Sequence, residues 1–156
     1  MARTVSHGTF VIERTYPAAP ERIFAAFSDA TKKRKWFAGG DGPDTESHTL
    51  DFRVGGIERT VRRMGDGTPF PGAALINESV YQDIQPGKRI VFAYTMSLNE
   101  YRISASLATV ELLAEGQGTK MVFTDQGAYF EGSDGVERRE HGWKTILQSL
   151  DQELAA

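Results

Sequence analysis

Few side chains in this sequence have the types and spacing that catalysis or metal binding requires. The chain has no cysteine, which excludes disulfides, thiolate zinc sites and thiol nucleophiles. The histidines His7, His48 and His141 show no metal-ligand spacing. Ser104 and Ser106 lie on an expected strand, and no histidine near them in the sequence suggests activation. We find no metalloprotease, nucleophile-elbow, phosphate-loop or dinucleotide-binding motif, so the sequence indicates no catalytic residue, no metal and no cofactor.

The densest run of basic residues is Lys32-Lys33-Arg34-Lys35. Such a run can bind nucleic acid or anionic lipid, but four basic residues on a short surface helix more often form a solvated face. The formal net charge of the chain is −3, which argues against a nucleic-acid partner because phosphate neutralisation needs a basic surface. We therefore interpret the run as a solvated helix face.

The first elements of the chain follow from its periodicity and its prolines. A strand is expected from Gly8 to Tyr16, and Pro17 to Pro20 end it. A helix is expected from Glu21 to Ser28, because proline is tolerated at a first helical position. Asp29 can cap a second short helix that runs to about Phe37.

The rest of the chain changes first to strands and then back to helix. Between about Thr49 and Gln126, alternating stretches separated by glycine, proline and asparagine turns predict about six consecutive antiparallel strands. From about Gly135 to Leu154 the apolar residues return to helical spacing, which predicts one long amphipathic helix. The fold class is therefore α+β, with a curved antiparallel sheet of about seven strands around a long C-terminal helix and two short helices after the first strand.

Bulk composition bounds the organisation of the chain. At 156 residues, 40% apolar and 25% charged, we expect one domain over residues 1–156 with an ordered core of about 8–155. No apolar run reaches about 18 residues, so we expect no membrane insertion. The first seven residues lack the apolar stretch of a secretory signal, which favours the cytoplasm.

Alternation predicts which strand residues face the long helix. In the strand from Ile90 to Met96 the bulkier set is Ile90, Phe92, Tyr94 and Met96, so we place it inward. Asp125 continues the inward set of a later strand, and we favour a solvated strand end for it over a place at a pocket mouth. Burial among apolar walls would instead raise its pKa.

Gly142 lies inside the predicted long helix, where glycine costs about 1 kcal/mol relative to alanine. Two explanations stay open. Either a loop or ligand approaches closely there, or the helix begins near Trp143 with Gly142 in its first turn.

Ordered motifs along nearly the whole chain resemble the START-like, or SRPBCC, helix-grip superfamily. Within it the chain is similar to the bacterial branch related to the C-terminal domain of the activator of the ninety-kilodalton heat-shock chaperone ATPase. The matching segments are Tyr16 to Phe24, Arg34 to Phe37, Asp51 to Gly56, Gly87 to Phe92, Ala108 to Leu112, Gly118 to Met121 and His141 to Trp143.

The resemblance implies a pocket between sheet and helix that binds an apolar or amphipathic small molecule. The ligand-binding residues expected on this basis are Trp36, Phe37, Phe92, Tyr94, Met96, Arg102, Phe123, Asp125, Trp143 and Ile146. Trp36 and Phe37, which precede a glycine-rich loop, are expected at the pocket rim, and packing against the long helix is the alternative for both.

Two other functions are compatible with the resemblance. A cyclase or hydratase-like enzyme would need a titratable pair in the pocket, for example Asp125 near Tyr94 or Arg102. A chaperone-interacting stress protein would need a filled core and an exposed apolar patch. The eukaryotic co-chaperone carries an additional N-terminal domain for which 156 residues leave no room, which argues against chaperone activation. A homodimer and a chaperone contact both stay open.

Overall fold

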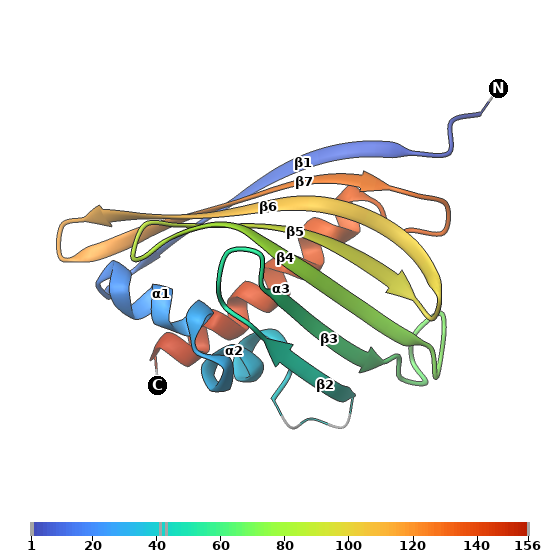
Figure 1. Cartoon of the computed structure of the whole chain (residues 1–156), viewed down its shortest axis with the longest axis horizontal. Coiled ribbons are helices and arrows are strands. Elements are labelled where there is room, and N and C mark those ends of the chain that lie inside the picture. Colours follow the sequence, from blue (N-terminus) through green and yellow to red (C-terminus); the bar gives the residue numbers. More distant parts are fainter. Residues whose placement is uncertain (1, 41, 43, 156) are drawn as a thin grey trace.

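Turn residues and alternating hydrophobicity divide most of the chain into strands. The computed structural model describes residues 2–40, 42 and 44–155, and in these it contains seven strands and three helices (Figure 1). The strands are β1 (Ser6–Tyr16), β2 (Thr45–Leu50), β3 (Ile57–Arg63), β4 (Ala74–Gln85), β5 (Arg89–Leu98), β6 (Tyr101–Glu115) and β7 (Gly118–Tyr129). The helices are α1 (Pro20–Ser28), α2 (Ala30–Phe37) and α3 (Val136–Ala155).

All seven strands form one antiparallel sheet in the order β1-β7-β6-β5-β4-β3-β2. Strands β2 to β7 form a meander, because short turns let consecutive antiparallel strands pair. β1 pairs with β7 along its whole length, from Ser6 opposite Tyr129 to Tyr16 opposite Thr119. Helix α3 crosses one face of the curved sheet, and α1 and α2 lie beside it (Figure 1). This is the predicted α+β helix-grip architecture.

The two short helices begin where the sequence predicts. Pro20 is in the first turn of α1. Asp29 caps α2, since its side chain accepts a hydrogen bond from the backbone N–H of Lys32 at 3.0 Å. A single residue, Asp29, therefore separates α1 from α2.

Helix α3 confirms the predicted long helix but not either explanation of Gly142. The helix begins at Val136, a turn and a half before Gly142, so the glycine is not in the first turn. Gly142 is exposed, and a Cβ built there would meet nothing within 4 Å. Within the described residues, no loop approaches closely enough to require glycine at this position. Neither α3 nor any other helix in the described ranges is long and apolar enough to span a membrane.

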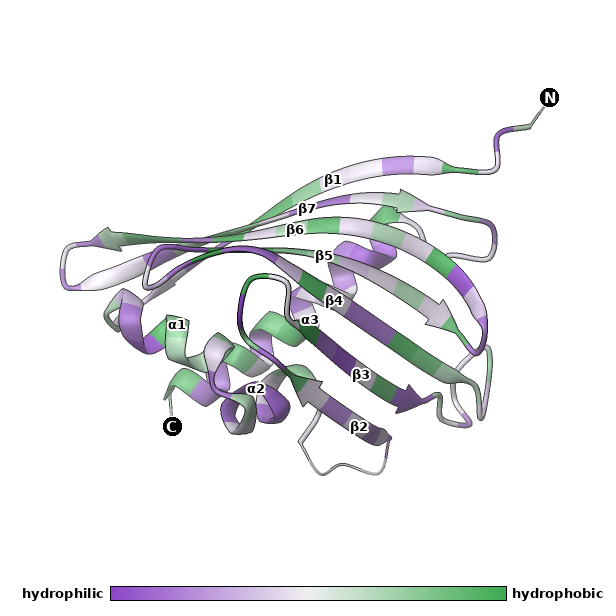
Figure 2. Ribbon diagram, in the orientation of Figure 1, coloured by the Kyte–Doolittle hydropathy of each residue, from purple (hydrophilic) through white to green (hydrophobic). Residues whose placement is uncertain are grey.

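The core lies between the concave face of the sheet and α3. Figure 2 shows bands of hydrophobic and hydrophilic residues along β3 and β4, without a strict alternation of the two kinds. Ile90, Phe92 and Tyr94 are buried on that face, as the alternation predicts. Met96, the fourth member of the set, is partly buried where the core meets a cavity.

The structure also decides the orientation of β4, which alternation alone leaves ambiguous. Ser79 and Tyr81 are buried, whereas Glu78 is exposed. The concave face of β4 therefore carries Leu75, Asn77, Ser79 and Tyr81. This face brings polar side chains, rather than an apolar row, under helix α3.

Candidate functional site

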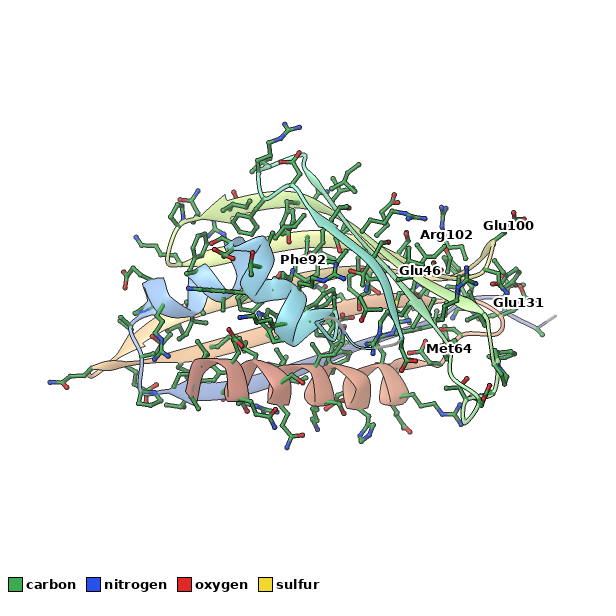
Figure 3. The ribbon with its side chains drawn as sticks, turned by 90° about the horizontal axis from the view of Figure 1, so that it is seen from below. Glu46, Met64, Phe92, Glu100, Arg102 and Glu131 are labelled. Atoms are coloured by element: carbon green, nitrogen blue, oxygen red, sulfur yellow. The ribbon has the colours of Figure 1, made fainter. Side chains whose placement is uncertain are left out.

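A cavity lies between the concave face of the sheet and α3, at the end of the sheet where α3 begins. It consists of two neighbouring pockets that share Leu75 and Met96 in their linings. We call the pocket of about 230 Å³ the outer section and the pocket of about 70 Å³ the inner section. Figure 3 shows Met64, which lines the outer section, near the first turns of α3. Apolar residues dominate the outer section: Met64, Pro69, Phe70, Leu75, Met96, Leu98 and Ile103.

The cavity continues outward into a shallow surface groove of about 510 Å³ that shares Phe70, Leu98 and Ile103 with the outer section. Phe70 is 52% exposed and Tyr101, which also lines the groove, is 54% exposed. Two exposed aromatic side chains therefore lie at the wide end of the cavity.

Polar residues line the narrow end of the cavity. The inner section is lined by Thr60, Arg62 and Asn77 together with Phe37, Leu75, Met96 and Ile146. The pairing of strands explains this arrangement, because Thr60 lies opposite Asn77, and Asn77 lies opposite Met96. Thr60 is only 4% exposed, and its hydroxyl has no hydrogen-bond partner.

A buried hydrogen-bond cluster centres on the hydroxyl of Tyr94. That hydroxyl donates to Oδ2 of Asp125 at 2.5 Å and accepts from Nε1 of Trp143 at 3.1 Å and from Nη1 of Arg139 at 3.3 Å. Arg139 also forms an ion pair with Asp134, with 2.8 Å between Nε and Oδ2. We call these five residues the Tyr94 cluster. The cluster ties β5 and β7 to the first half of α3.

Asp125 is not at a solvated strand end, which corrects the expectation from sequence. It is 0% exposed, because β7 runs on to Tyr129 and the side chain of Asp125 is on the face that α3 covers, next to Tyr94 and Trp143, whereas Gln126 on the other face is exposed. Burial raises the pKa of Asp125 to about 6, although the hydrogen bond from Tyr94 and the charge of Arg139 act in the opposite direction. Its other oxygen, Oδ1, is buried without a partner. The carboxyl group therefore changes charge near neutral pH inside the core.

A second buried cluster corrects the interpretation of the basic run. Lys32 and Lys35 are exposed, but Lys33 is only 2% exposed. Its ammonium donates to Oε1 of Glu58 at 2.6 Å and to the hydroxyl of Tyr81 at 3.2 Å. The reason is that helical spacing puts Lys33 on the same face of α2 as Trp36 and Phe37, which pack into the core.

Aromatic rings surround this buried ammonium. The Nζ of Lys33 lies 4.8 Å from the centroid of the Phe37 ring. Four further rings lie within 6.0 Å of it, those of Phe27, Trp36, Tyr81 and Phe92. Cation–π attraction therefore adds to the ion pair in holding the charge inside the protein.

Glu58 is the anion of this second cluster. His48 lies 2.8 Å from its Oε2, and the hydroxyl of Tyr81 donates to Oε1 at 2.7 Å. Burial alone would raise the pKa of Glu58, but the charge of Lys33 and hydrogen bonds from His48, Lys33 and Tyr81 lower it to about 2. In the described part of the chain no three histidine, aspartate or glutamate side chains gather as a metal site would need. We call Lys33, His48, Glu58 and Tyr81 the Lys33 cluster.

The ten residues expected to bind ligand lie in three places. Phe37, Met96 and Ile146 line the cavity. Six others are buried in the core and line neither section: Trp36, Phe92, Tyr94, Phe123, Asp125 and Trp143. The rings of Phe123 and Trp143 lie 4.5 Å apart between centroids and are tilted by 42°. Arg102 is exposed, and Figure 3 shows it toward the same end of the molecule as Glu100 and Glu131, away from Phe92. That these ten residues contact a ligand stays a prediction.

Sequence reasoning missed the polar lining of the cavity. Glu58, Thr60 and Arg62 share the concave face of β3, whereas Ile57, an apolar residue, is exposed. A rule that turns the apolar residues of β3 inward would place Ile57 and Val61 on the concave face, which is the wrong face. The only signal in the sequence is for Lys33, whose spacing from Trp36 places it on an apolar helix face.

Comparison with known proteins identifies relatives. The model of a family described as Activator of Hsp90 ATPase homolog 1-like protein matches residues 17–155. Comparison with curated proteins finds no match. An uncharacterised protein from Rhizobium leguminosarum is 40% identical, with a TM-score of 0.90 and 99% of each chain covered. Mll3558 from Rhizobium loti is 44% identical, with a TM-score of 0.85 over 97% of this chain and 99% of its own.

A more distant likeness concerns the fold alone. DynU16, a protein in the dynemicin biosynthetic locus, is 16% identical, with a TM-score of 0.67. The match covers 95% of this chain and 47% of that one.

Proposed function

This chain belongs to the family of activator of Hsp90 ATPase homolog 1-like proteins, as its motifs predict, and from this premise we propose a function. We propose that the protein binds a small amphipathic molecule between the sheet and α3. The cavity carries this proposal. Its outer section is mostly apolar, and its inner section offers a few polar groups, which is the usual composition of a small-molecule site. The buried hydroxyl of Thr60 supports the same conclusion, since an unpaired polar group in a protein interior is costly unless a ligand or water completes it.

The size of the cavity limits the ligand. At about 30 Å³ for each water-sized group, sections of about 230 and 70 Å³ hold roughly ten non-hydrogen atoms. A larger molecule would have to extend past Phe70 into the surface groove. The proposal therefore favours small aliphatic or aromatic metabolites over full-length lipids.

Native mass spectrometry of gently purified protein tests the proposal. We expect a co-purified small molecule, or else a stabilising compound in a thermal-shift screen of aliphatic and aromatic metabolites. A ligand at a hundred times its Kd adds about 2.7 kcal/mol to the free energy of unfolding. For a chain of this size that free energy raises the Tm by roughly 5–10 °C.

A matched pair of variants tells binding in the cavity from binding at the surface. Leu75→Trp fills the junction of the two sections, whereas Ile76→Trp adds the same volume to the opposite face of β4. Both should be checked for a cooperative melt. Loss of binding in Leu75→Trp alone supports the cavity. Equal binding by both variants would reject it.

A catalytic role has one observation in its favour, the hydrogen-bonded pair of Tyr94 and Asp125. The pair is buried and lines neither section of the cavity described above. The double variant Tyr94→Phe with Asp125→Asn should therefore keep ligand binding. If the wild type turns over a substrate and the double variant does so at the same rate, Tyr94 and Asp125 are not a catalytic pair.

A chaperone partner is supported by the description of the matching family. Titration calorimetry with the Hsp90-class chaperone of the host tests it directly. No heat of binding at micromolar protein would reject the chaperone partner without affecting the proposed binding of a small molecule.

A further inference from the structure

Arg62 carries an unpaired charge beside the inner section of the cavity. The residue is partly buried, and within the described ranges no hydrogen bond or ion pair engages its guanidinium. The other arginines of this strand differ, because Arg59 and Arg63 are exposed and pair with Glu78 and Glu46. A charged group that is partly removed from water costs free energy unless a partner compensates it. The position of Arg62 therefore suits an anionic group bound in the inner section.

Two uncharged polar groups lie with Arg62 at the same narrow end. The hydroxyl of Thr60 has no partner. The amide oxygen of Asn77 accepts only a 3.5 Å hydrogen bond from Ser79, which leaves its NH₂ group available as a donor. Thr60 and Asn77 sit opposite each other on β3 and β4, and Arg62 is two residues from Thr60 on the same face. Guanidinium, hydroxyl and amide thus form a set of donors that suits a carboxylate.

The two sections of the cavity match the two ends of such a molecule. The inner section of about 70 Å³ has room for a head group of roughly two to three non-hydrogen atoms at about 30 Å³ each. The outer section is mostly apolar, so it suits a short hydrocarbon or aromatic tail. At the mouth, Asp134 already pairs with Arg139, and only Arg138 offers a further cation among the lining residues.

We propose that the ligand is an amphipathic organic acid whose carboxylate binds Arg62, Thr60 and Asn77 in the inner section while its tail fills the outer section. This inference rests on the proposed function and adds to it the chemical class and the orientation of the ligand. It also assigns a role to Arg62, whose charge has no partner in the described structure.

Isothermal titration of three probes with matched tails tests the inference: octanoate, octan-1-ol and octylamine. We expect octanoate to bind roughly tenfold to a hundredfold more tightly than octan-1-ol, because hydrogen bonds between charged groups add this much affinity. Octylamine should bind most weakly, because its ammonium group would face the guanidinium of Arg62. In Arg62→Gln the preference for octanoate over octan-1-ol should disappear. In the matched control Arg59→Gln, on the opposite face of β3, it should be unchanged.

Two further variants separate binding from stability and orientation. Thr60→Val removes a buried hydroxyl that has no partner, so the Tm should not fall while octanoate binding weakens. Arg138→Gln should leave the preference unchanged, because the head group is at the inner end.

Each outcome decides the inference. Octan-1-ol binding as tightly as octanoate, or a preference that survives Arg62→Gln in a folded protein, overturns the organic acid while leaving the pocket. A preference lost in Arg138→Gln instead overturns the orientation. Failure of all three probes and of the wider metabolite screen overturns the proposed function itself.

Discussion

The pH dependence of stability should reveal the buried carboxyl group of Asp125. Its pKa is raised from 3.8 to about 6 by burial, so the native protein holds this proton more tightly than the unfolded chain. Asp125→Asn keeps the shape of the side chain and its acceptor for Tyr94, but it removes the charge. The variant should therefore be spared the cost of ionising a carboxyl group inside the core.

The size and sign of the effect follow from linkage. For a group whose pKa is raised in the native state, stability is fully present below the unfolded value, near pH 4, and is lost as pH rises to about 6. The shift of about two units corresponds to about 3 kcal/mol at 1.36 kcal/mol per unit. At pH 4 the unfolded carboxyl is already partly ionised, so the free energy of unfolding of Asp125→Asn, minus that of the wild type, should increase by about 2 kcal/mol between pH 4 and pH 7.

Urea unfolding monitored by tryptophan fluorescence at half-unit pH steps measures this difference. Groups that both proteins share and that do not interact with Asp125, such as Glu58, cancel in the subtraction. Asp66→Asn is the control, because it removes one negative charge from an exposed loop residue. A difference between Asp125→Asn and the wild type that stays constant from pH 4 to pH 7 would refute the reasoning. So would a change equal to that of the control.

Three other substitutions test the packing and the helices. Gly142→Ala should raise the free energy of unfolding by about 1 kcal/mol, since open space surrounds this helical position; a loss in urea unfolding would contradict that. Lys33→Met should lower it by roughly 3–5 kcal/mol because Glu58 is left charged and buried, and adding Glu58→Gln should recover part of the loss; no recovery would contradict the ion-pair account. Asp29→Ala should cost about 1 kcal/mol through the lost cap of α2, whereas an unchanged Tm would show that the cap contributes nothing.

Local patterns in the sequence determine the elements and their order. Pro20 begins α1 and Asp29 caps α2 because each acts on backbone groups within four residues of itself. The turns between strands depend equally on neighbouring residues, so they specify a meander. The family resemblance follows from the same local segments. Helical spacing also predicts α3, although it does not explain Gly142, whose cost the rest of the fold tolerates.

The candidate site depends on contacts between residues far apart in the chain. Lys33 becomes a buried cation only because Glu58 and Tyr81 come from two strands that pair beneath α2. Asp125 is buried because its face of β7 is covered by α3, whose Trp143 shares the hydroxyl of Tyr94 with it.

The lining of the cavity shows the same limit most clearly. Thr60 and Arg62 face the core side of β3 against the apolar-inward rule, because the cavity between the sheet and α3 leaves room for polar groups there. Period-two alternation can list the two faces of a strand, but the curvature of the sheet and the position of α3 select which face is enclosed. The sequence alone therefore determined the helix-grip fold and its family, while the tertiary structure decided which side chains meet at the site.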